Sequence, residues 1–289
     1  MPRSGNGKAT GDFRMPTMTD LLAAANAPWS AQGRCWGLIP CAGVGSRAIG
    51  PDVPDPELPK QYQPVAGQPL VLHTLAAFAG VQRLAGTLVV VAPGDTFLQA
   101  YPASAWFTQD CGGATRADTV TAGLKTLLAR GAAQHDWVLV HDAARCLVTP
   151  QQINALIDAC EHDSVGGLLA HKLPDTLKTA ITGPGGVRVA STVDRSDKWL
   201  AQTPQMFRLG VLLDALQRMG AAATDEASAM EALGHRPKLV PGGAQNFKVT
   251  YPDDFALAAA VLAQRAGGAT MERFQGRRNQ VPPPGNPFF

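Results

Sequence analysis

The chain carries little net charge, and this shortage limits what it can bind. Among its 289 residues, 25 Lys and Arg are set against 23 Asp and Glu, which gives a formal net charge of +2. A nucleic-acid-binding domain usually has a strongly basic surface. We therefore expect no nucleic-acid partner, and any anion site must be local and built from a few placed cations.

Paired cysteines and long apolar runs are also missing. The five cysteines include no C-x-x-C pair, which argues against a zinc site or a disulfide framework and favours a reducing compartment. No apolar run reaches the roughly 18 to 20 residues that span a bilayer. The first residues lack the apolar segment of a secretory signal. The sequence thus predicts a cytoplasmic protein with no membrane partner.

Composition divides the chain into a leader, one domain and a tail. Residues 1–33 are rich in Gly, Ala, Ser and Pro, and residues 267–289 end in a Pro-rich stretch. Such compositions are typical of disordered segments. The periodic apolar segments lie within residues 34–266, and we expect these residues to form one folded domain.

Short apolar runs alternate with helical patterns in this domain. Three runs are almost continuously apolar, as is typical of strands in a parallel sheet covered on both faces, at Trp36–Pro40, Thr87–Ala92 and Trp137–Asp142. Helical patterns occur at Leu70–Ala79, Asp118–Ala133 and Pro150–Cys160. This alternation predicts an α/β fold with a mostly parallel twisted sheet flanked by helices, whose ligands bind at the carboxyl ends of the strands.

Residues 171–195 interrupt the alternation. Apolar and polar side chains alternate here on both sides of a Gly-Pro-Gly-Gly turn, which is the signature of a β-hairpin. The sequence offers no helix to cover this hairpin. It is therefore either a surface flap or an arm that grips another subunit.

A Gly-rich loop, residues 40–50, follows the first predicted strand. Gly43 and Gly45 let the backbone turn tightly and approach a ligand, and backbone N–H groups in such loops bind phosphates. Arg47 and, further on, Lys60 add positive charge. The loop also fits a relaxed dinucleotide fingerprint, but a Pro-rich stretch follows it instead of a helix. Phosphate binding is therefore favoured over a nicotinamide site or a plain surface loop.

Asp142 ends the third apolar run, where a carboxylate would meet a metal-bound triphosphate. Mg²⁺ prefers one or two carboxylates together with phosphate oxygens, so Asp142 is the candidate Mg²⁺ ligand. The alternative is that Asp142 caps the next turn, which is a common role of Asp. We interpret the neighbouring His141 as structural.

A second Gly-rich turn leads into the helical pattern that begins near Asp118. Gly112, Gly113 and Arg116 occur together in this turn, and the combination favours nucleotide recognition over helix capping. For Asp118 itself, an N-cap role and recognition of the base fit equally well.

Two later segments carry charged candidates. Asp225 and Glu226 lie at a predicted helix start, where acidic residues complement the helix dipole. Only in combination with Asp142 does Asp225 become a site candidate. Lys248 lies in the middle of a predicted strand, Asn246–Thr250, and a lysine there suggests an anion partner.

Nine segments occur in an order that closely resembles the 2-C-methyl-D-erythritol 4-phosphate cytidylyltransferase family, over about residues 36–262. They are PCAGVGSR, PKQY, GGATRADTV, VLVHDAAR, DTLK, TVDR, TPQMF, TDEAS and FKVT. The resemblance implies a Rossmann-like nucleotidyltransferase fold and a homodimer held by a projecting β-arm. It also implies Mg²⁺ as cofactor, with CTP and 2-C-methyl-D-erythritol 4-phosphate as substrates and pyrophosphate as a product, in isoprenoid precursor synthesis.

The resemblance also assigns roles to single positions. Arg47, Lys60 and Lys248 would bind the reacting phosphates, and Asp142 would hold Mg²⁺. The nucleotide site would comprise Ala42, Gly43, Gly45, Gly112, Gly113, Arg116, Thr119 and Ala143. The polyol phosphate side would comprise Arg145, Thr203 and Asp225, together with the arm residues Asp175, Thr176 and Arg195, which would reach into the partner subunit's site.

Two alternatives stay open at this point. A ribitol-5-phosphate cytidylyltransferase would share the fold, the loop and the chemistry, and the strings HDAAR and TDEAS favour the methylerythritol enzyme. A dinucleotide-binding oxidoreductase would require a helix directly after the Gly-rich loop. The sequence has a Pro-rich stretch and PKQY there instead.

Overall fold

The computed structural model describes residues 33–45, 48, 55–101 and 105–278. Its centre is a seven-stranded sheet with the strand order β11-β7-β10-β6-β1-β4-β5. The strands are β1 (Cys35–Pro40), β4 (Leu84–Val90), β5 (Trp106–Gln109), β6 (Trp137–Val140), β7 (Gly166–Lys172), β10 (Trp199–Arg208) and β11 (Lys238–Pro241). The predicted α/β fold with a mostly parallel sheet is confirmed, and the three predicted strands correspond to β1, β4 and β6.

One strand of the sheet, β10, runs against the others. It pairs antiparallel with β6 on one side and with β7 on the other. The chain leaves the sheet at the end of β7, forms a hairpin outside it, and returns beside β7 at Trp199, which pairs with Lys172. A direct return to the neighbouring position can only be antiparallel, because a parallel return would need a crossover.

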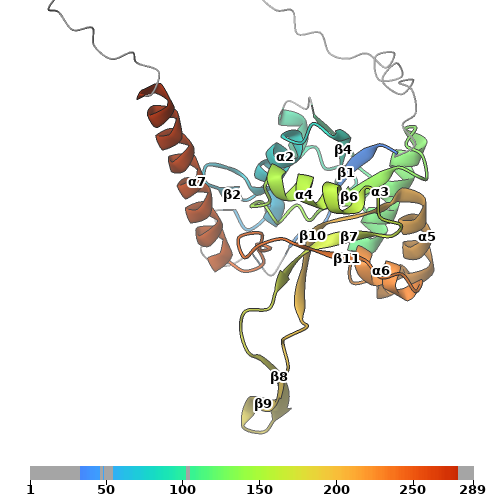
Figure 1. Ribbon diagram of the computed structural model, residues 1–289, viewed down its shortest axis with the longest axis vertical. Helices are drawn as coiled ribbons and strands as arrows, with labels where there is room; N and C mark the ends of the chain where they lie inside the picture. Colours follow the sequence, from blue (N-terminus) through green and yellow to red (C-terminus); the bar gives the residue numbers. More distant parts are fainter. Residues whose placement is uncertain (1–32, 46–47, 49–54, 102–104, 279–289) are drawn as a thin grey trace, which may run out of the picture.

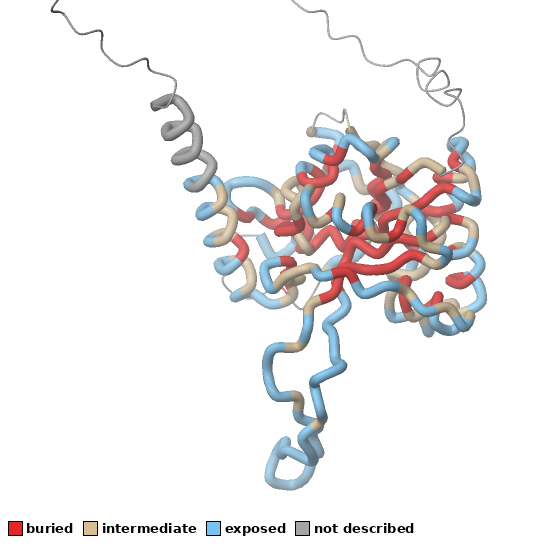
Figure 2. The backbone as a smooth tube through the Cα atoms, viewed as in Figure 1, coloured by how far each residue is buried: buried red, intermediate tan, exposed pale blue. Residues whose placement is uncertain are grey.

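Helices cover both faces of the sheet, and the strands supply apolar side chains to both. In β6, Trp137 and Leu139 face a cluster with α2 (Leu70–Ala79) and α4 (Pro150–Cys160). Val138 and Val140 face the other cluster, with α3 (Arg116–Ala129), α5 (Leu209–Met219) and α6 (Glu226–Ala232). Successive side chains of a strand point to opposite faces. A strand buried on both faces must therefore be apolar throughout, as the sequence pattern indicated. Figure 2 shows the central strands of the body in the red of buried residues.

The helix starts follow from capping residues. Helix α4 begins as predicted, with Thr149 and Gln152 forming a capping box around Pro150. Helix α3 begins two residues earlier than expected. Thr115 is its N-cap, and Asp118 completes a capping box from the third helical position instead of being the cap itself. The prediction that Asp118 is an N-cap was therefore wrong, because the Thr115 hydroxyl accepts from the Asp118 backbone N–H.

The hairpin predicted at residues 171–195 is present. Strands β8 (Leu177–Gly183) and β9 (Gly186–Val193) pair antiparallel as a separate two-stranded sheet. Figure 1 shows this arm projecting from the body of the molecule, below the ends of β7 and β10. A smaller ribbon, formed by β2 (Pro64–Val65) and β3 (Gln68–Pro69), leads into α2.

The last helix differs from the expected domain boundary at residue 266. Helix α7 (Asp253–Arg278) starts directly after Pro252 and continues into the expected tail. Residues 267–278 contain several strong helix formers, and the first proline after them is Pro282. The remaining calls of a disordered leader at 1–33 and tail at 279–289 lie outside the described residues except for Gly33. Among the described residues, no helix is both long and apolar enough to cross a membrane.

The segment Asn246–Thr250 is not the strand that the sequence predicted. It runs alongside the loop after β6, where the Val249 backbone N–H donates to the Ala144 carbonyl at 2.9 Å. Strand β11 ends before it and occupies the sheet edge beside β7. The segment therefore lies over the carboxyl end of β6, and this position places Lys248 next to Asp142.

Candidate active site

A hollow of about 470 Å³ opens at the carboxyl ends of the parallel strands. The loops after β1, β5 and β6 supply most of its wall. Ten predicted site residues line it, namely Ala42, Gly43, Gly45, Lys60, Gly113, Arg116, Thr119, Asp142, Ala143 and Lys248. The predicted nucleotide, phosphate and metal positions are thus largely brought together, although they span 206 positions of the sequence, from residue 42 to residue 248.

The loop after β1 requires glycine at position 45. Gly45 has a φ of +69°, a region that L side chains rarely adopt, and a Cβ there would lie 2.6 Å from the Cβ of Lys60. The close approach lets the Lys60 backbone N–H donate to the Val44 carbonyl at 3.2 Å. This contact joins the Gly-rich loop to the PKQY segment. Arg47 lies outside the described residues.

Lys60 is held at the base of the hollow. Its side chain is 92% buried (relative exposure 8%), and its Nζ donates to the Val249 carbonyl at 2.8 Å. The next residue, Gln61, also lines the hollow, and its side-chain amide donates to the Cys41 carbonyl at 2.9 Å. The sequence interpretation did not assign Gln61. Its place inside the PKQY segment was the one available signal.

The turn after β5 packs its two glycines against neighbours. A Cβ on Gly112 would lie 2.2 Å from the Cβ of Ala42, and a Cβ on Gly113 would lie 2.3 Å from the Cβ of Asp118. A larger residue at position 112 would therefore push the two Gly-rich loops apart, and one at position 113 would push the turn away from α3. The Gly113 N–H donates to the Thr119 hydroxyl at 3.1 Å, which fixes the turn against the first turn of α3.

Asp142 lies at the centre of a cluster of charges. Its Oδ1 accepts from Arg116 Nε at 2.9 Å, and its Oδ2 lies 2.9 Å from Lys248 Nζ and 3.6 Å from Arg145 Nε. Burial alone would raise the pKa of the Asp142 carboxyl. The three cations outweigh burial and hold that pKa far below its usual range. The carboxylate is therefore charged at any pH at which the protein works.

Glu226 completes this cluster, and its role differs from the one that the sequence suggested. The side chain is almost fully buried, with 1% exposed, and accepts from both terminal nitrogens of Arg116, at 2.6 Å and 3.1 Å. Arg116 thus bridges Asp142 and Glu226. Burial alone would lower the pKa of Arg116, but the two carboxylates raise it above its ordinary value. The position of Glu226 at a predicted helix start indicated only an interaction with the helix dipole, and this bridge was not predicted.

His141 and Thr203 fix the backbone of Asp142 from behind. The Asp142 N–H donates to the Thr203 hydroxyl at 3.1 Å, and this hydroxyl lies 3.0 Å from His141 Nδ1. His141 Nε2 lies 3.2 Å from the Arg145 carbonyl, which can only accept. Burial lowers the pKa of His141 to about 4. A neutral ring with its proton on Nε2 satisfies all three contacts, so His141 is structural, as predicted.

Several predicted site residues lie outside the hollow. Gly112 packs behind it, and Thr203 is buried beneath Asp142. Arg145 donates to the Asn246 carbonyl at 2.8 Å. Asp225 serves as the N-cap of α6 and also accepts from the Gln205 amide at 2.9 Å.

The three candidates on the arm are exposed. Asp175 and Thr176 precede β8, and Arg195 follows β9 and donates to the Leu173 carbonyl at 3.2 Å. The structure therefore places these three residues around the base of the arm. Within the described part of the chain, none of them lines the hollow beside Asp142.

The donor set fits a metal ion that arrives with a nucleotide. The described residues contain no cluster of three or more His, Cys, Asp or Glu side chains able to hold a metal ion. Among the described residues that line the hollow, Asp142 is the one that offers carboxylate oxygens, with 10% of its side chain exposed. Mg²⁺ bound through one carboxylate and several phosphate oxygens needs no more from the protein.

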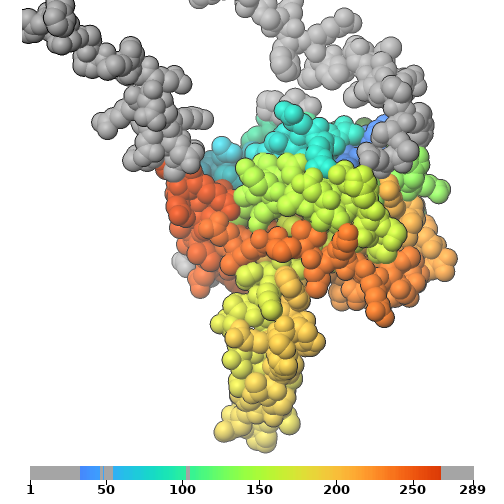
Figure 3. All heavy atoms as spheres, viewed as in Figure 1, coloured from blue at the N-terminus to red at the C-terminus, as the bar shows by residue number. Residues whose placement is uncertain are grey.

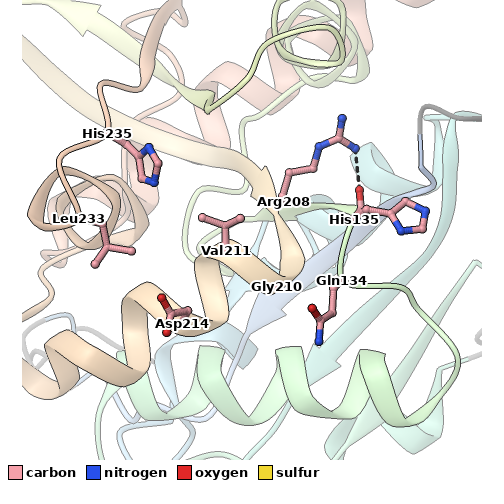
Figure 4. Close-up of a pocket in the computed structure, with 8 residues that line it drawn as sticks. All are labelled: Gln134, His135, Arg208, Gly210, Val211, Asp214, Leu233 and His235. Carbon is pink, nitrogen blue, oxygen red and sulfur yellow. Dashed lines mark hydrogen bonds between the residues drawn. The ribbon is translucent and has the colours of Figure 1, made fainter.

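A second hollow, of about 690 Å³, lies away from these residues. It is bounded by the start of α5, the loop before β6 and the segment after α6 (Figure 4). In Figure 4 the rings of His135 and His235 lie far apart, and the marked bond joins Arg208 to the carbonyl of His135. This second hollow opens at the amino ends of the parallel strands, whereas α/β proteins bind ligands at the carboxyl ends. We therefore assign the site to the hollow beside Asp142.

Comparisons with known proteins agree with this geometry. The family model of 2-C-methyl-D-erythritol 4-phosphate cytidylyltransferase matches residues 36–264. An enzyme of that name from Burkholderia multivorans is 48% identical over 241 residues, which cover 82% of this chain and 99% of the relative. The bifunctional enzyme IspD/IspF of Albidiferax ferrireducens is 64% identical over 237 residues, but these are 81% of this chain and only 54% of that protein. The chain thus spans about half the length of the bifunctional relative.

Solved structures show the same similarity. A crystal structure of 4-diphosphocytidyl-2C-methyl-D-erythritol synthase superposes with a TM-score of 0.68 at 39% identity, covering 80% of this chain and 99% of that one. The 2-C-methyl-D-erythritol 4-phosphate cytidylyltransferase of Francisella tularensis gives a TM-score of 0.65 at 30% identity, covering 78% and 98%. Because the family model matches residues 36–264, which are most of this chain, the chain belongs to the 2-C-methyl-D-erythritol 4-phosphate cytidylyltransferase family.

Proposed function

We propose that this chain transfers the cytidylyl group of CTP to 2-C-methyl-D-erythritol 4-phosphate, releasing pyrophosphate, as a step in isoprenoid precursor synthesis. The observation that carries the proposal is the arrangement around Asp142. One buried carboxylate, two Gly-rich loops and the side chains of Lys60, Arg116 and Lys248 line a single hollow. Such a hollow suits a triphosphate, whose charge is neutralised by a few cations and one metal ion.

In the proposed reaction, a phosphate oxygen of the acceptor attacks the α-phosphorus of CTP. A new P–O bond forms, the bond from the α-phosphorus to the bridging oxygen of the β-phosphate breaks, and pyrophosphate leaves with that electron pair. The phosphate dianion is already a nucleophile and needs no general base. The residues of the chain therefore act by alignment and by stabilising the charge that builds in the transition state.

Different residues would serve the two parts of CTP. Lys60, Lys248 and Arg47 would stabilise the negative charge of the phosphates, and backbone N–H groups of residues 42–45 would bind phosphate oxygens. The second loop, with Gly112 and Gly113, would form the cytidine pocket together with Ala42, Thr119 and Ala143. Close packing of that loop against the first one keeps the pocket narrow.

The proposed metal is Mg²⁺, held by Asp142. When bound, it would supply positive charge to the phosphate oxygens of the nucleotide. Arg116 and Lys248 hold the two oxygens of Asp142 in place, at 2.9 Å each. Arg145 and Thr203, which lie beside and beneath this carboxylate, are candidates for the polyol phosphate side. Asp225, which accepts from the Gln205 amide at 2.9 Å, is the third candidate.

The projecting arm is the observation that supports a proposed homodimer. Asp175, Thr176 and Arg195 lie at its exposed base, and we propose that they complete the acceptor site of a partner subunit. All five cysteines are unpaired, which is consistent with the reducing environment of the cytoplasm.

A pyrophosphate-release assay tests the proposed function. Purified protein with Mg²⁺ would be given each of the four nucleoside triphosphates, with 2-C-methyl-D-erythritol 4-phosphate or with ribitol 5-phosphate as the acceptor. We expect release only with CTP and the methylerythritol acceptor. Faster release with ribitol 5-phosphate would reassign the acceptor, and no release with any pair would overturn the proposal.

A further inference from the structure

Glu226 is buried to a degree that helix capping does not require. It is the first residue of α6, and a carboxylate at that position interacts with the helix dipole equally well when it is exposed to water. Yet only 1% of the Glu226 side chain is exposed. Burying a charge is costly unless a partner compensates for it. The partner here is Arg116, which comes from the start of α3, 110 positions away in the sequence.

The geometry of Arg116 shows what Glu226 does to it. Glu226 accepts from both terminal nitrogens, and this contact holds Arg116 in an orientation in which it gives its Nε to Asp142 Oδ1. Guanidinium and carboxylate groups pair most strongly when two parallel hydrogen bonds form. Without Glu226, the terminal nitrogens would be available for such a bidentate pair with Asp142. Since Lys248 already contacts Oδ2 of Asp142 at 2.9 Å, that pair would surround the carboxylate with cations.

Loss of the Glu226 charge would also make the cluster around Asp142 more positive, which would likewise oppose metal binding. Three cations, Arg116, Arg145 and Lys248, are in contact with two carboxylates, Asp142 and Glu226, which leaves one positive charge in excess. Loss of the Glu226 charge would leave two. A divalent cation approaching Asp142 would then be repelled more strongly, in a partly buried site where screening by water is weak.

We propose that Glu226 is a positioning residue that draws the terminal nitrogens of Arg116 away from Asp142 and so keeps this carboxylate available to the metal–nucleotide complex. The inference rests on the proposed function for its metal and nucleotide. Glu226 would act through Arg116, because Arg116 lines the hollow and Glu226 is not one of the described residues that line it.

The test is Glu226→Gln, which keeps the shape of the side chain and removes its charge. Replacing an outer partner of a metal ligand typically weakens metal binding by about 10- to 100-fold. We expect the Mg²⁺ concentration for half-maximal pyrophosphate release to rise by that factor, with a much smaller change in kcat at saturating Mg²⁺. A second readout needs no turnover. In the presence of CTP and absence of acceptor, Mn²⁺ binding followed by electron paramagnetic resonance should weaken by the same factor.

Two further variants separate positioning from damage to the fold. Glu226→Asp keeps the charge and should restore part of the metal affinity. Glu231→Gln, on the exposed side of the same helix, should bind Mn²⁺ like the wild type. Wild-type Mn²⁺ affinity in Glu226→Gln would overturn the inference.

The decisive comparison uses a background without Arg116. In Arg116→Gln, the additional change Glu226→Gln should weaken Mn²⁺ binding far less than it does in the wild type, because the residue through which Glu226 acts is gone and only the loss of its charge remains. This double variant also avoids the unpaired buried carboxylate that Arg116→Gln alone would leave at Glu226, so folding is preserved better than in that single variant. An equal loss of affinity in both backgrounds would show that Glu226 does not act through Arg116. If the wild type binds Mn²⁺ and CTP but releases no pyrophosphate, the proposed function fails while the role of Glu226 is still measured.

Discussion

The site beside Asp142 and the β-arm are built in opposite ways. Around Asp142, side chains from α3, α6 and the segment after β11 meet through bonds between residues far apart in the sequence. In the arm, the side-chain bonds join β8 to β9, as from Lys178 Nζ to the Thr192 hydroxyl at 2.7 Å. Figure 3 shows the arm standing clear of the body.

The difference lies in what each region needs from outside the chain. The charges near Asp142 are already paired within one chain. The arm instead exposes three apolar side chains, Ile181 at 61%, Val187 at 71% and Val189 at 64%. An isolated two-stranded hairpin is only marginally stable in water. One region therefore contains its own supporting contacts, and the other exposes apolar surface, which supports the proposed contact with a partner subunit.

The largest expected effect is a loss of catalytic rate from a change at the site beside Asp142. Lys60→Ala should lower kcat by about 10²- to 10³-fold, with a smaller change in KM, because a preorganised cation that stabilises the transition state is lost. Steady-state kinetics with CTP and the methylerythritol acceptor would measure it. Lys125→Ala, an exposed lysine on α3, is the matched control and should retain wild-type kcat. A near-normal kcat in Lys60→Ala would remove Lys60 from the mechanism.

A second, smaller effect tests the buried support beneath the site. His141 has a pKa of about 4 in the folded protein, because burial disfavours its charged form, against an ordinary value of about 6.5 in the unfolded chain. Above a pH of about 6.5, His141 is neutral in both the folded and the unfolded protein. As the pH falls from 6.5 to 4, only the unfolded state takes up the proton, so the free energy of unfolding falls by about 3 kcal/mol.

Urea unfolding at several pH values measures this contribution. His141→Gln cannot take up the proton, so the stability difference between wild type and variant should shift by about 3 kcal/mol between pH 7 and pH 4. His162→Gln, at an exposed position, is the control for the loss of a histidine as such. Parallel curves for His141→Gln would contradict the assignment of a buried neutral ring.

The smallest expected signal tests the dependence of the arm on a partner. Arg195→Ala and Lys60→Ala protein should each be poorly active alone. After subunit exchange in an equal mixture, about a quarter of all sites would combine an intact Lys60 with an intact partner arm, if two chains form a symmetric dimer. Recovery of roughly that fraction of the wild-type rate is the expected result. No recovery after verified exchange would mean that each site is built from one chain.

Local patterns in the sequence were sufficient for most of the fold. Helix α2 and helix α4 begin and end where the apolar pattern placed them, at Leu70–Ala79 and Pro150–Cys160. The hairpin of the arm followed from its alternation and its central glycines. The segment around Lys248 was misjudged as a strand, because its apolar neighbours pack against the loop after β6 and α7 instead of joining the sheet.

The residue types of the site were likewise readable from the chain, and the resemblance to a known family ordered them. Gly-rich loops, a carboxylate at a strand end and scattered cations are each local features, so a sequence can display them. The sequence by itself therefore determined the fold class, the loops and most of the residues that line the hollow.

Only the tertiary structure decided which of these residues touch. Glu226 read as a helix-start residue, yet folding buries it against Arg116 and thereby divides the guanidinium between two carboxylates. Asp225, its neighbour, caps the same helix instead. The physical reason is that capping depends on the backbone within one turn, whereas burial and charge pairing depend on which distant elements the packed core brings together.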